Sequence, residues 1–270
     1  MKKIAFLFTT LCATALIYTS CSSDSDIATQ TDTTAVGASV AIDAANELDI
    51  STGLSVTNSA ATAKSAETIC ATVTVSSPSG QTYPKIYTVD YGTAGCTENL
   101  LTRKGKLKIT LTGSIISAGS KLIIERIDYS INGLKLEGTI EYTNTTTVAT
   151  MPQWSRKVTN GKFTDLQGRV YLNSGTHTVR QIAGVDTPYI LTDNIYEMTS
   201  GTHTVTTEKN ETLTLTVEEA LVKKYSCAYV SKGKLKIEGG LLNGVIDYGN
   251  NDCDTKFTYT QNGLTYNLSM

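Results

Sequence analysis

Short runs in which apolar and polar residues alternate fill most of the chain beyond residue 70. Such alternation places alternate side chains on opposite faces of a β-strand, so it predicts strands with one buried face. The clearest runs cover 72–76, 106–112, 122–131, 134–143, 154–163, 169–182, 189–198, 204–208, 212–217, 234–238, 245–248, 256–260 and 264–268. Two intervening turns, Asn132-Gly133 and Asn262-Gly263, favour two-residue hairpin loops. The pattern therefore predicts an all-β domain of antiparallel hairpins, arranged as a sandwich or as an elongated stack of meanders.

The chain opens with a pattern that is typical of a secretory signal. Lys2 and Lys3 precede an apolar run from Ile4 to Ile17, which is too short to span a bilayer as a permanent helix. Small and polar residues then lead to Cys21. This order is similar to a bacterial lipoprotein signal, in which cleavage before the cysteine frees it for acylation, so we predict Cys21 as the lipidation site. The alternative is an ordinary cleavable signal and a soluble periplasmic protein.

The stretch after Cys21 is polar and begins with acidic residues. Ser22-Ser23-Asp24-Ser25-Asp26 resembles the tag that directs Bacteroidota lipoproteins to the outer face of the outer membrane. One acyl chain holds a protein at a membrane only marginally, whereas two or three chains hold it firmly. We therefore expect an outer-membrane location with a lipid anchor, in which the membrane is a partner and the tag favours the cell exterior.

The segment before the strands shows helical rather than alternating periodicity. Four apolar residues recur at roughly helical spacing, namely Val36, Val40, Ala44 and Leu48. They predict one short helix near 36–50, and Gly53 with the threonines after it argues against a longer one. We expect a signal peptide at 1–20, an anchor and flexible tether at 21–35, an Ala/Ser/Thr-rich segment with the helix at 36–66, and the β-rich domain at 67–270.

The cysteines indicate an oxidising compartment. Cys12 belongs to the signal, and four cysteines remain besides the anchor, namely Cys70, Cys96, Cys227 and Cys253. Members of each local pair stand 26 positions apart, which favours Cys70–Cys96 and Cys227–Cys253 among the three connectivities that four cysteines allow. The alternative is four free or metal-bound thiols, but the close cysteine pairs of zinc sites are missing.

A duplicated motif surrounds these cysteines. Asp90-Tyr91-Gly92 stands before Cys96, and Asp247-Tyr248-Gly249 stands at the same distance before Cys253. Each unit is predicted to be a hairpin whose open ends are tied by a disulfide. Its turn is expected at Pro78-Ser79-Gly80 in the first unit, and at Gly239-Gly240 or Asn243-Gly244 in the second.

The order of these motifs resembles a family of uncharacterised Bacteroidota lipoproteins. Besides the duplicated units it includes Thr102-Arg103-Lys104-Gly105-Lys106, Asn132-Gly133, Glu137-Gly138 and Asn262-Gly263-Leu264-Thr265-Tyr266. The resemblance covers about residues 67 to 270. It implies an exported, lipid-anchored protein and no particular activity. Asn251-Asp252 departs from the family pattern, which is more often glycine-rich at that bend.

The two histidines occur in a second repeat, Ser-Gly-Thr-His-Thr-Val at 174–179 and 200–205. Strand alternation places each histidine on the same face as the valine two residues later. One interpretation is a metal site formed by His177 and His203 with Asp193 or Glu197. The other is a pair of half-buried histidines satisfied by neighbouring groups, which we favour because no close ligand motif is present.

The single tryptophan, Trp154, also has two interpretations. Next to Pro152 and ahead of Arg156-Lys157, it is a candidate sugar-stacking ligand platform. It is equally suited to the core, which we favour because buried aromatic residues are commoner than ligand platforms.

Charge and motif content narrow the classes of function. The chain has 23 basic and 25 acidic residues without a strong basic cluster, so we expect no nucleic-acid partner. It contains no G-x-S-x-G, H-E-x-x-H or phosphate-binding glycine loop, so we predict no cofactor, no metal and no catalytic residues. The favoured function is a non-enzymatic structural, adhesive or ligand-binding module with a glycan or protein ligand.

The alternative function is a glycan-acting hydrolase or a polysaccharide-binding accessory protein. A glycosidase needs two carboxylates in one cleft. The candidates lie on the hairpin around Asn132-Gly133, namely Glu125, Asp128, Glu137 and Glu141. Carboxylates that alternate with apolar residues are more often the solvated face of a sheet, which disfavours this alternative.

Overall fold

The computed structural model describes residues 24–62 and 70–270, with side chains described for 33–58 and 70–270. The proposed signal and Cys21 lie outside the described residues, so lipidation stays a prediction. The described chain forms one helix, α1 (Asp24–Thr62), and fourteen strands. The strands are β1 (Thr72–Ser76), β2 (Lys85–Asp90), β3 (Cys96–Glu98), β4 (Leu101–Leu111), β5 (Lys121–Ile131), β6 (Leu134–Asn144), β7 (Gln153–Thr164), β8 (Val170–Ala183), β9 (Ile195–Thr206), β10 (Thr212–Lys224), β11 (Lys232–Gly239), β12 (Leu242–Asn250), β13 (Lys256–Gln261) and β14 (Leu264–Ser269).

All fourteen strands belong to one open antiparallel sheet. The order is β1-β2-β4-β5-β6-β7-β8-β9-β10-β11-β12-β13-β14, with β3 pairing only to β4, so the chain runs as a continuous meander. The all-β antiparallel prediction is confirmed. Of the two arrangements, the elongated meander is found, and among the described residues no second sheet completes a sandwich.

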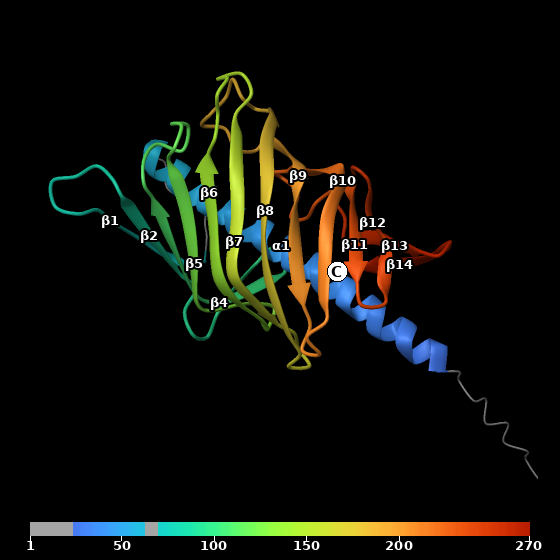
Figure 1. Ribbon diagram of the computed structural model, residues 1–270. Helices are drawn as coiled ribbons and strands as arrows, with labels where there is room; N and C mark the ends of the chain where they lie inside the picture. The colour runs from blue at the N-terminus through green and yellow to red at the C-terminus, as the bar shows by residue number, and fades with distance from the viewer. Residues whose placement is uncertain (1–23, 63–69) are drawn as a thin grey trace, which may run out of the picture.

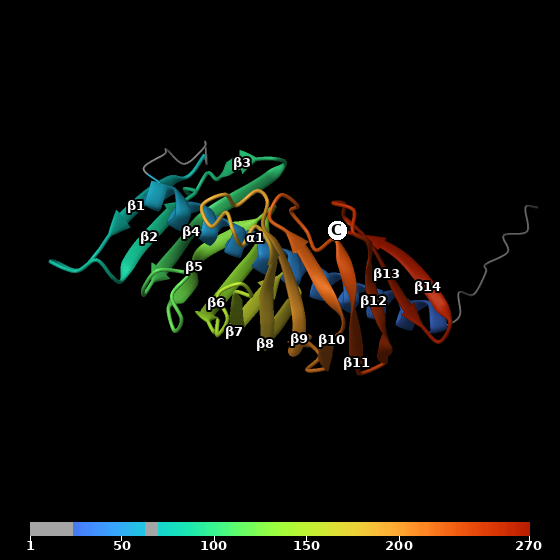
Figure 2. The ribbon, with the colours of Figure 1, turned by 90° about the horizontal axis from the view of Figure 1, so that it is seen from above.

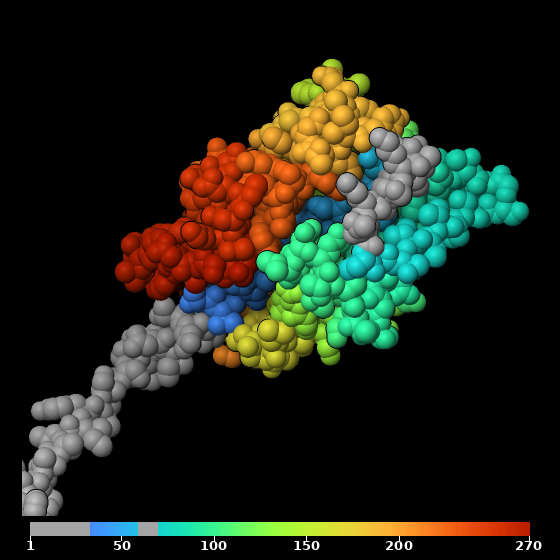
Figure 3. Space-filling view, turned by 180° about the vertical axis from the view of Figure 1, so that it is seen from behind, coloured from blue at the N-terminus to red at the C-terminus, as the bar shows by residue number. Residues whose placement is uncertain are grey.

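The sheet curves around α1. Figures 1 and 2 show the helix crossing the strands along the concave side, from beside β14 to beside β1 and β2. Seen from behind, it lies between the segment that contains β3 and β4 and the C-terminal strands (Figure 3). Apolar residues from the helix and the inner sheet face form one core. A helix enclosed in this way needs no single apolar stripe, which is why its periodicity is weak in the sequence.

The helix is longer than predicted at both ends. It begins at Asp24, inside the expected flexible tether, and it continues through Gly53 to Thr62. Serine and threonine hydroxyl groups can favour other backbone conformations. Here those of Ser39, Thr52 and Thr57 instead donate to the carbonyls four residues earlier in the helix. A Cβ at Gly53 would lie 3.1 Å from Ile124 Cδ1, so the glycine permits close helix–sheet contact. Tertiary packing thus overrides the low helix propensity.

The hairpin predictions are largely confirmed. Asn132-Gly133 and Asn262-Gly263 have positive φ at both residues and join β5 to β6 and β13 to β14. The runs at 189–198 and 204–208 differ from the structure, since one strand, β9, covers 195–206 and the residues before it form a loop. Other observed strand boundaries differ from the predicted ones, because β-bulges change the face on which side chains lie.

Both predicted disulfides are present. Cys70–Cys96 ties the open ends of the β1–β2 hairpin, and Cys227–Cys253 ties those of β11–β12. In each unit the motif aspartate accepts a hydrogen bond from the amide of the glycine two residues later, at 2.9 Å for Asp90 and 2.8 Å for Asp247. Pairing of Gly239 with Leu242 places the second turn at Gly240-Leu241, one residue after the expected Gly239-Gly240 and not at Asn243-Gly244. The duplicated sequence therefore folds into a duplicated structure near each edge of the sheet.

We expect the two disulfides to contribute unequally to global stability. Replacing Cys227 and Cys253 by alanine should lower the free energy of unfolding by about 3 kcal/mol, as expected for a loop of this size. The same change at Cys70 and Cys96 should cost less, because β1 is an edge strand that can open locally. Urea unfolding of both double variants measures the difference, and an equal loss in both would contradict this prediction.

Candidate functional site

The helix carries three carboxylates into the interior. Asp43, Glu47 and Asp49 are all buried, although ordinary globular cores exclude unpaired carboxylates. Cations and hydroxyl groups from the inner face of the sheet meet them. The resulting ionic core between α1 and the sheet is the main concentration of chemically functional groups in the described residues.

The first group of this ionic core surrounds Asp49. Arg126 of β5 donates from Nε to Asp49 Oδ2 at 2.7 Å and from Nη2 to Asn46 Oδ1 at 2.9 Å. Tyr129 donates its hydroxyl to Asp49 Oδ1 at 2.7 Å. Both carboxylate oxygens are therefore satisfied, which makes burial of the charge tolerable. This geometry holds the helix against β5.

Arg103 extends the Asp49 group toward the first duplicated unit. Its Nη1 donates to Thr52 Oγ1 and to the hydroxyl of Tyr91, each at 2.8 Å. Burial raises the pKa of Tyr91 and of Tyr129, and the nearby Asp49 carboxylate raises both further. These phenols therefore remain protonated donors. Arg103 has the same strand alternation as the buried Leu107 and Ile109, so it faces the interior, whereas Lys106 and Lys108 of the same strand face solvent.

The second group surrounds Arg156 of β7, which is only 1% exposed. Its Nη1 donates to Glu47 Oε1 at 2.6 Å, and its Nη2 lies 3.8 Å from Asp43 Oδ1. The same Nη2 lies 3.1 Å from His177 Nδ1. Because a guanidinium can only donate, His177 Nδ1 must accept, which places the proton of the neutral ring on Nε2.

The tautomer of His177 also fixes the tautomer of the second histidine. His177 Nε2 lies 3.4 Å from His203 Nδ1, so His203 accepts there and carries its own proton on Nε2. That Nε2 faces Asp43 Oδ2 at 3.7 Å. The four side chains thus form a directed chain from Arg156 through His177 and His203 to Asp43, with both rings neutral.

The pKa of each histidine agrees with neutral rings. Burial depresses the pKa of His177 strongly, and the positive charge of Arg156 depresses it further. Burial also lowers the pKa of His203, although the Asp43 carboxylate opposes this effect. Protonation of either ring would add a cation beside the buried guanidinium.

The structure separates the residues of the predicted metal site. His177 and His203 lie side by side on the inner face with their valines, as strand alternation predicted. Asp193 instead accepts from Thr187 at 2.6 Å in an exposed loop, and Glu197, adjacent to buried Met198, lies on the outer face. Within residues 33–58 and 70–270, no group of three or more potential ligands can hold a metal ion. The second interpretation is met in part, because the histidines contact Arg156 and each other, but they are fully rather than half-buried and His203 Nε2 has no hydrogen-bond partner among the described residues.

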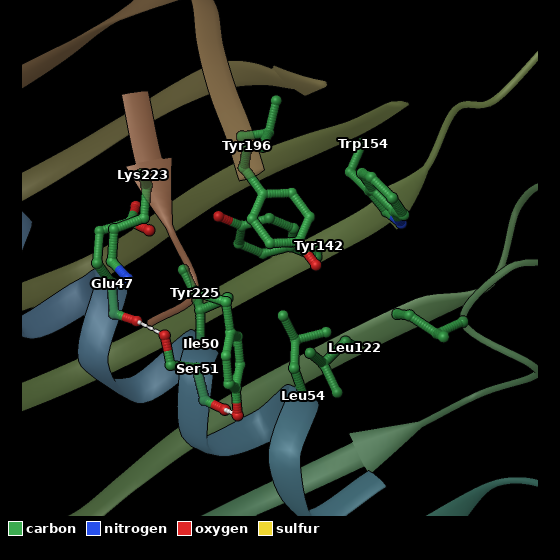
Figure 4. A pocket seen from close by; sticks show the side chains of 12 residues that line it. Glu47, Ile50, Ser51, Leu54, Leu122, Tyr142, Trp154, Tyr196, Lys223 and Tyr225 are labelled. Atoms are coloured by element: carbon green, nitrogen blue, oxygen red, sulfur yellow. Dashed lines mark hydrogen bonds between the residues drawn. The ribbon is translucent and has the colours of Figure 1, made fainter. Parts of the chain in front are cut away.

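A cavity adjoins the ionic core. It lies between residues 47–54 of α1 and the inner face of the sheet, with a volume of about 40 Å³ (Figure 4). Six adjacent strands each contribute one wall residue, in order Leu122, Tyr142, Trp154, Val179, Tyr196 and Lys223. Most of this wall is apolar, and Glu47 and Lys223 supply its carboxylate and its amine.

Trp154 is part of the cavity wall and of the core. It is 8% exposed and contacts Tyr196 edge-on, with ring centroids 6.2 Å apart. An exposed sugar-stacking platform at Trp154 is therefore wrong, and the core interpretation is the one found. Its indole Nε1 is buried without a hydrogen-bond partner. Burial also raises the pKa of the neighbouring Tyr196 to about 12.

The carboxylates proposed for a hydrolase do not converge in a cleft. Glu125, Glu137 and Glu141 pair with lysines across the strands, at 2.8, 2.8 and 3.0 Å. Asp128 is exposed in the bulge of β5. They therefore belong to the solvated face of the sheet, as the alternating pattern suggested.

Sequence reasoning missed the ionic core itself. A signal was present, because Arg126 stands at the alternation positions of Leu122 and Ile124, and Arg156 at those of Trp154 and Val158. A cation in register with the buried face predicts an internal partner. The three acidic residues within an Ala/Ser/Thr-rich helix supply that partner.

Comparison with protein-family models, curated proteins and solved structures finds no match for this chain. Within the part of the chain that the structure describes, no helix is both long and apolar enough to cross a membrane.

We expect removal of the buried guanidinium to be strongly destabilising. Arg156→Met leaves Asp43 and Glu47 without their cation and should lower the free energy of unfolding by about 3–5 kcal/mol. The matched change is Lys162→Met, on the same strand as Arg156. It removes an exposed ion pair with Glu137 and should lower the free energy of unfolding by less than about 1 kcal/mol. Chemical denaturation of both variants tests this, and similar losses would exclude a structural role for the ionic core.

The histidine pair predicts acid sensitivity. Because both folded-state pKa values lie below the ordinary 6.5, the unfolded chain binds more protons and stability falls as pH drops below about 6.5. Between pH 7.5 and 5 the loss should be about 2 kcal/mol for His177, and His203 should add to it in the same direction. The titratable and charged groups around the two histidines are Asp43 and Glu47 of α1, Arg156 of β7 and Tyr248 of β12.

Urea unfolding at the two pH values measures this loss. The variant His177→Gln/His203→Gln should show a flatter pH dependence, because glutamine keeps hydrogen-bonding capacity without titrating. If the free energy of unfolding of this variant changed with pH as steeply as that of the unmodified protein, the acid sensitivity would belong to other groups.

Proposed function

We propose that the protein is a non-enzymatic, lipid-anchored module of the cell envelope, held at the outer membrane and acting through binding of a protein or glycan ligand. The observation that carries this proposal is the position of α1. The helix begins at Asp24, close after the predicted acylation site Cys21, and it continues as the internal axis of the sheet. An anchor at Cys21 would therefore be joined to the folded domain by a helix rather than a flexible tether.

Such an attachment would restrict the orientation of the domain. The first helical turns project past β14 in Figure 1, and the remainder is held by Arg126 and Arg156. Helix and sheet must then move together relative to the membrane. A fixed orientation suits a module that presents one face of its sheet or one set of loops to a ligand.

The distribution of ionisable groups supports a non-enzymatic role. The helix carboxylates are engaged by arginines, tyrosine or histidine inside the protein. The glutamates of β5 and β6 are engaged by lysines on the outer face. General acid–base catalysis requires groups that can reach a substrate and exchange a proton, and these pairings oppose both requirements.

A polysaccharide-binding accessory function is the second candidate. Exposed hydroxyl groups pair across neighbouring strands, with Thr206 and Thr212 at 3.0 Å and Thr260 and Thr265 at 3.0 Å. Rows of hydroxyl groups on a sheet can exchange hydrogen bonds with sugar hydroxyls. This candidate is weaker because Trp154, the proposed stacking platform, faces the core.

Detergent phase partitioning tests the anchor. The full chain should enter the detergent phase when produced in a bacterial host that processes lipoproteins, and Cys21→Ser should move to the aqueous phase because it lacks the acylated thiol. Mass spectrometry of the N-terminal peptide identifies the modification. An unmodified Cys21, or equal partitioning of both forms, would overturn lipid anchoring.

A hydrolysis screen on polysaccharides tests the non-enzymatic assignment. We expect no turnover, and Glu125→Gln, Glu137→Gln and Glu141→Gln should behave like the unmodified protein. Turnover that one of these substitutions abolishes would instead establish the hydrolase alternative.

A further inference from the structure

The cavity between α1 and β5–β10 has the composition of a binding site for a small amphiphile. Leu122, Tyr142, Trp154 and Val179 form its deep wall and are all buried. Pockets of this kind, largely apolar with a few polar groups, are the usual sites for small molecules. The volume of about 40 Å³ exceeds the roughly 10–15 Å³ that one water requires, so the enclosed part has room for a few atoms of a ligand, and the rest of a short alkyl chain would lie in the open rim.

The cavity opens toward solvent on one side. Ser51 and Leu54 of α1, Ile115 of the β4–β5 loop and Tyr225 after β10 are half-exposed and form this rim. Figure 4 shows Leu54 and Tyr225 on the helix side, with Trp154 and Tyr196 across the cavity. A ligand can therefore enter beside the helix without opening the sheet.

One polar group that the wall leaves available to a ligand is a hydrogen-bond donor. Lys223 donates to the carbonyls of Lys224 and Cys227, and an ammonium has a third N–H. No carboxylate lies within salt-bridge distance of Lys223 among the described residues, and Glu47, whose charge also acts on Lys223, is engaged by Arg156. The complementary ligand must therefore supply an acceptor.

Charge further restricts the ligand head group. A single carboxylate would compensate Lys223, whereas a dianionic phosphate would meet repulsion from Glu47 in a region of low dielectric constant. We propose that this cavity binds a short-chain monocarboxylate, with the carboxylate at Lys223 and the alkyl chain against Tyr142, Tyr196 and Trp154. This site does not depend on the lipid anchor.

Trp154 provides a direct reporter, because it is the single tryptophan of the chain and lines the cavity. The full chain with Cys21→Ser avoids acylation and detergent, which would compete for an apolar site. The probe is 6-bromohexanoate, whose bromine quenches an indole on contact, and the neutral comparison is 6-bromohexan-1-ol. We expect saturable quenching by the acid and weaker binding of the alcohol.

Two adjacent isoleucines provide matched variants. Ile115 lines the rim, whereas Ile116 is 62% exposed and is not part of the cavity wall. Ile115→Phe should fill the rim and raise the Kd of the acid about tenfold or more, which corresponds to about 1.4 kcal/mol. Ile116→Phe should leave the Kd unchanged. Quenching that is linear and unsaturable, or equal effects of the two substitutions, would overturn the site.

Lys223→Met tests the head-group assignment. It should raise the Kd of 6-bromohexanoate about tenfold, as expected for loss of a charge-assisted hydrogen bond, and leave binding of the alcohol unchanged. Circular dichroism confirms that the variant is folded, and the isoleucine pair decides the proposal should it unfold. Equal affinity for acid and alcohol in the unmodified protein would refute a carboxylate site, whether or not the protein is lipid-anchored.

Discussion

The enclosure of α1 depends on pairing of its buried carboxylates with cations of the sheet. Asp49 meets Arg126 and Glu47 meets Arg156, each at salt-bridge distance and each out of contact with water. Both pairs can form together only at one rotation and one axial position of the helix. Because an unpaired buried charge costs several kcal/mol, other positions are disfavoured. The ionic core thus specifies where the helix lies, while apolar burial supplies the general attraction.

The sheet must bend to surround a helix, and its bulges provide the bend. Register shifts interrupt most of the central strand pairs, from β4–β5 through β11–β12. Gly105 illustrates the requirement, because a Cβ there would lie 2.1 Å from the carbonyl oxygen of Asp128 on the next strand. Bulges increase local twist and turn side chains to the other face. The bulge of β5 at Asp128, opposite Gly105, lets both Arg126 and Tyr129 face inward and reach Asp49, so it also shapes the ionic core.

The duplicated units connect the sheet ends to the same interior. Tyr91 and Tyr248 are both buried, one beside Arg103 and Asp49 and the other beside Asp43. Each follows its aspartate at the end of a strand, where the positive φ of Gly92 or Gly249 turns the chain away. The repeated motif therefore directs one phenol from each half of the sheet toward the helix. Between these positions, where β5–β10 face the helix, the aromatic side chains leave the cavity.

The sequence by itself determined most of the strands, both Asn-Gly turns and the two disulfides, because these depend on alternation, local turn geometry and spacing within one hairpin. It also placed each histidine on the same face of its strand as the valine two residues later. Only the tertiary structure decided that α1 extends through Gly53, that one sheet surrounds it, and that Asp43, Glu47 and Asp49 meet Arg126 and Arg156. Those contacts join residues 77 to 113 positions apart, and local periodicity carries no information on which helix face meets which strand.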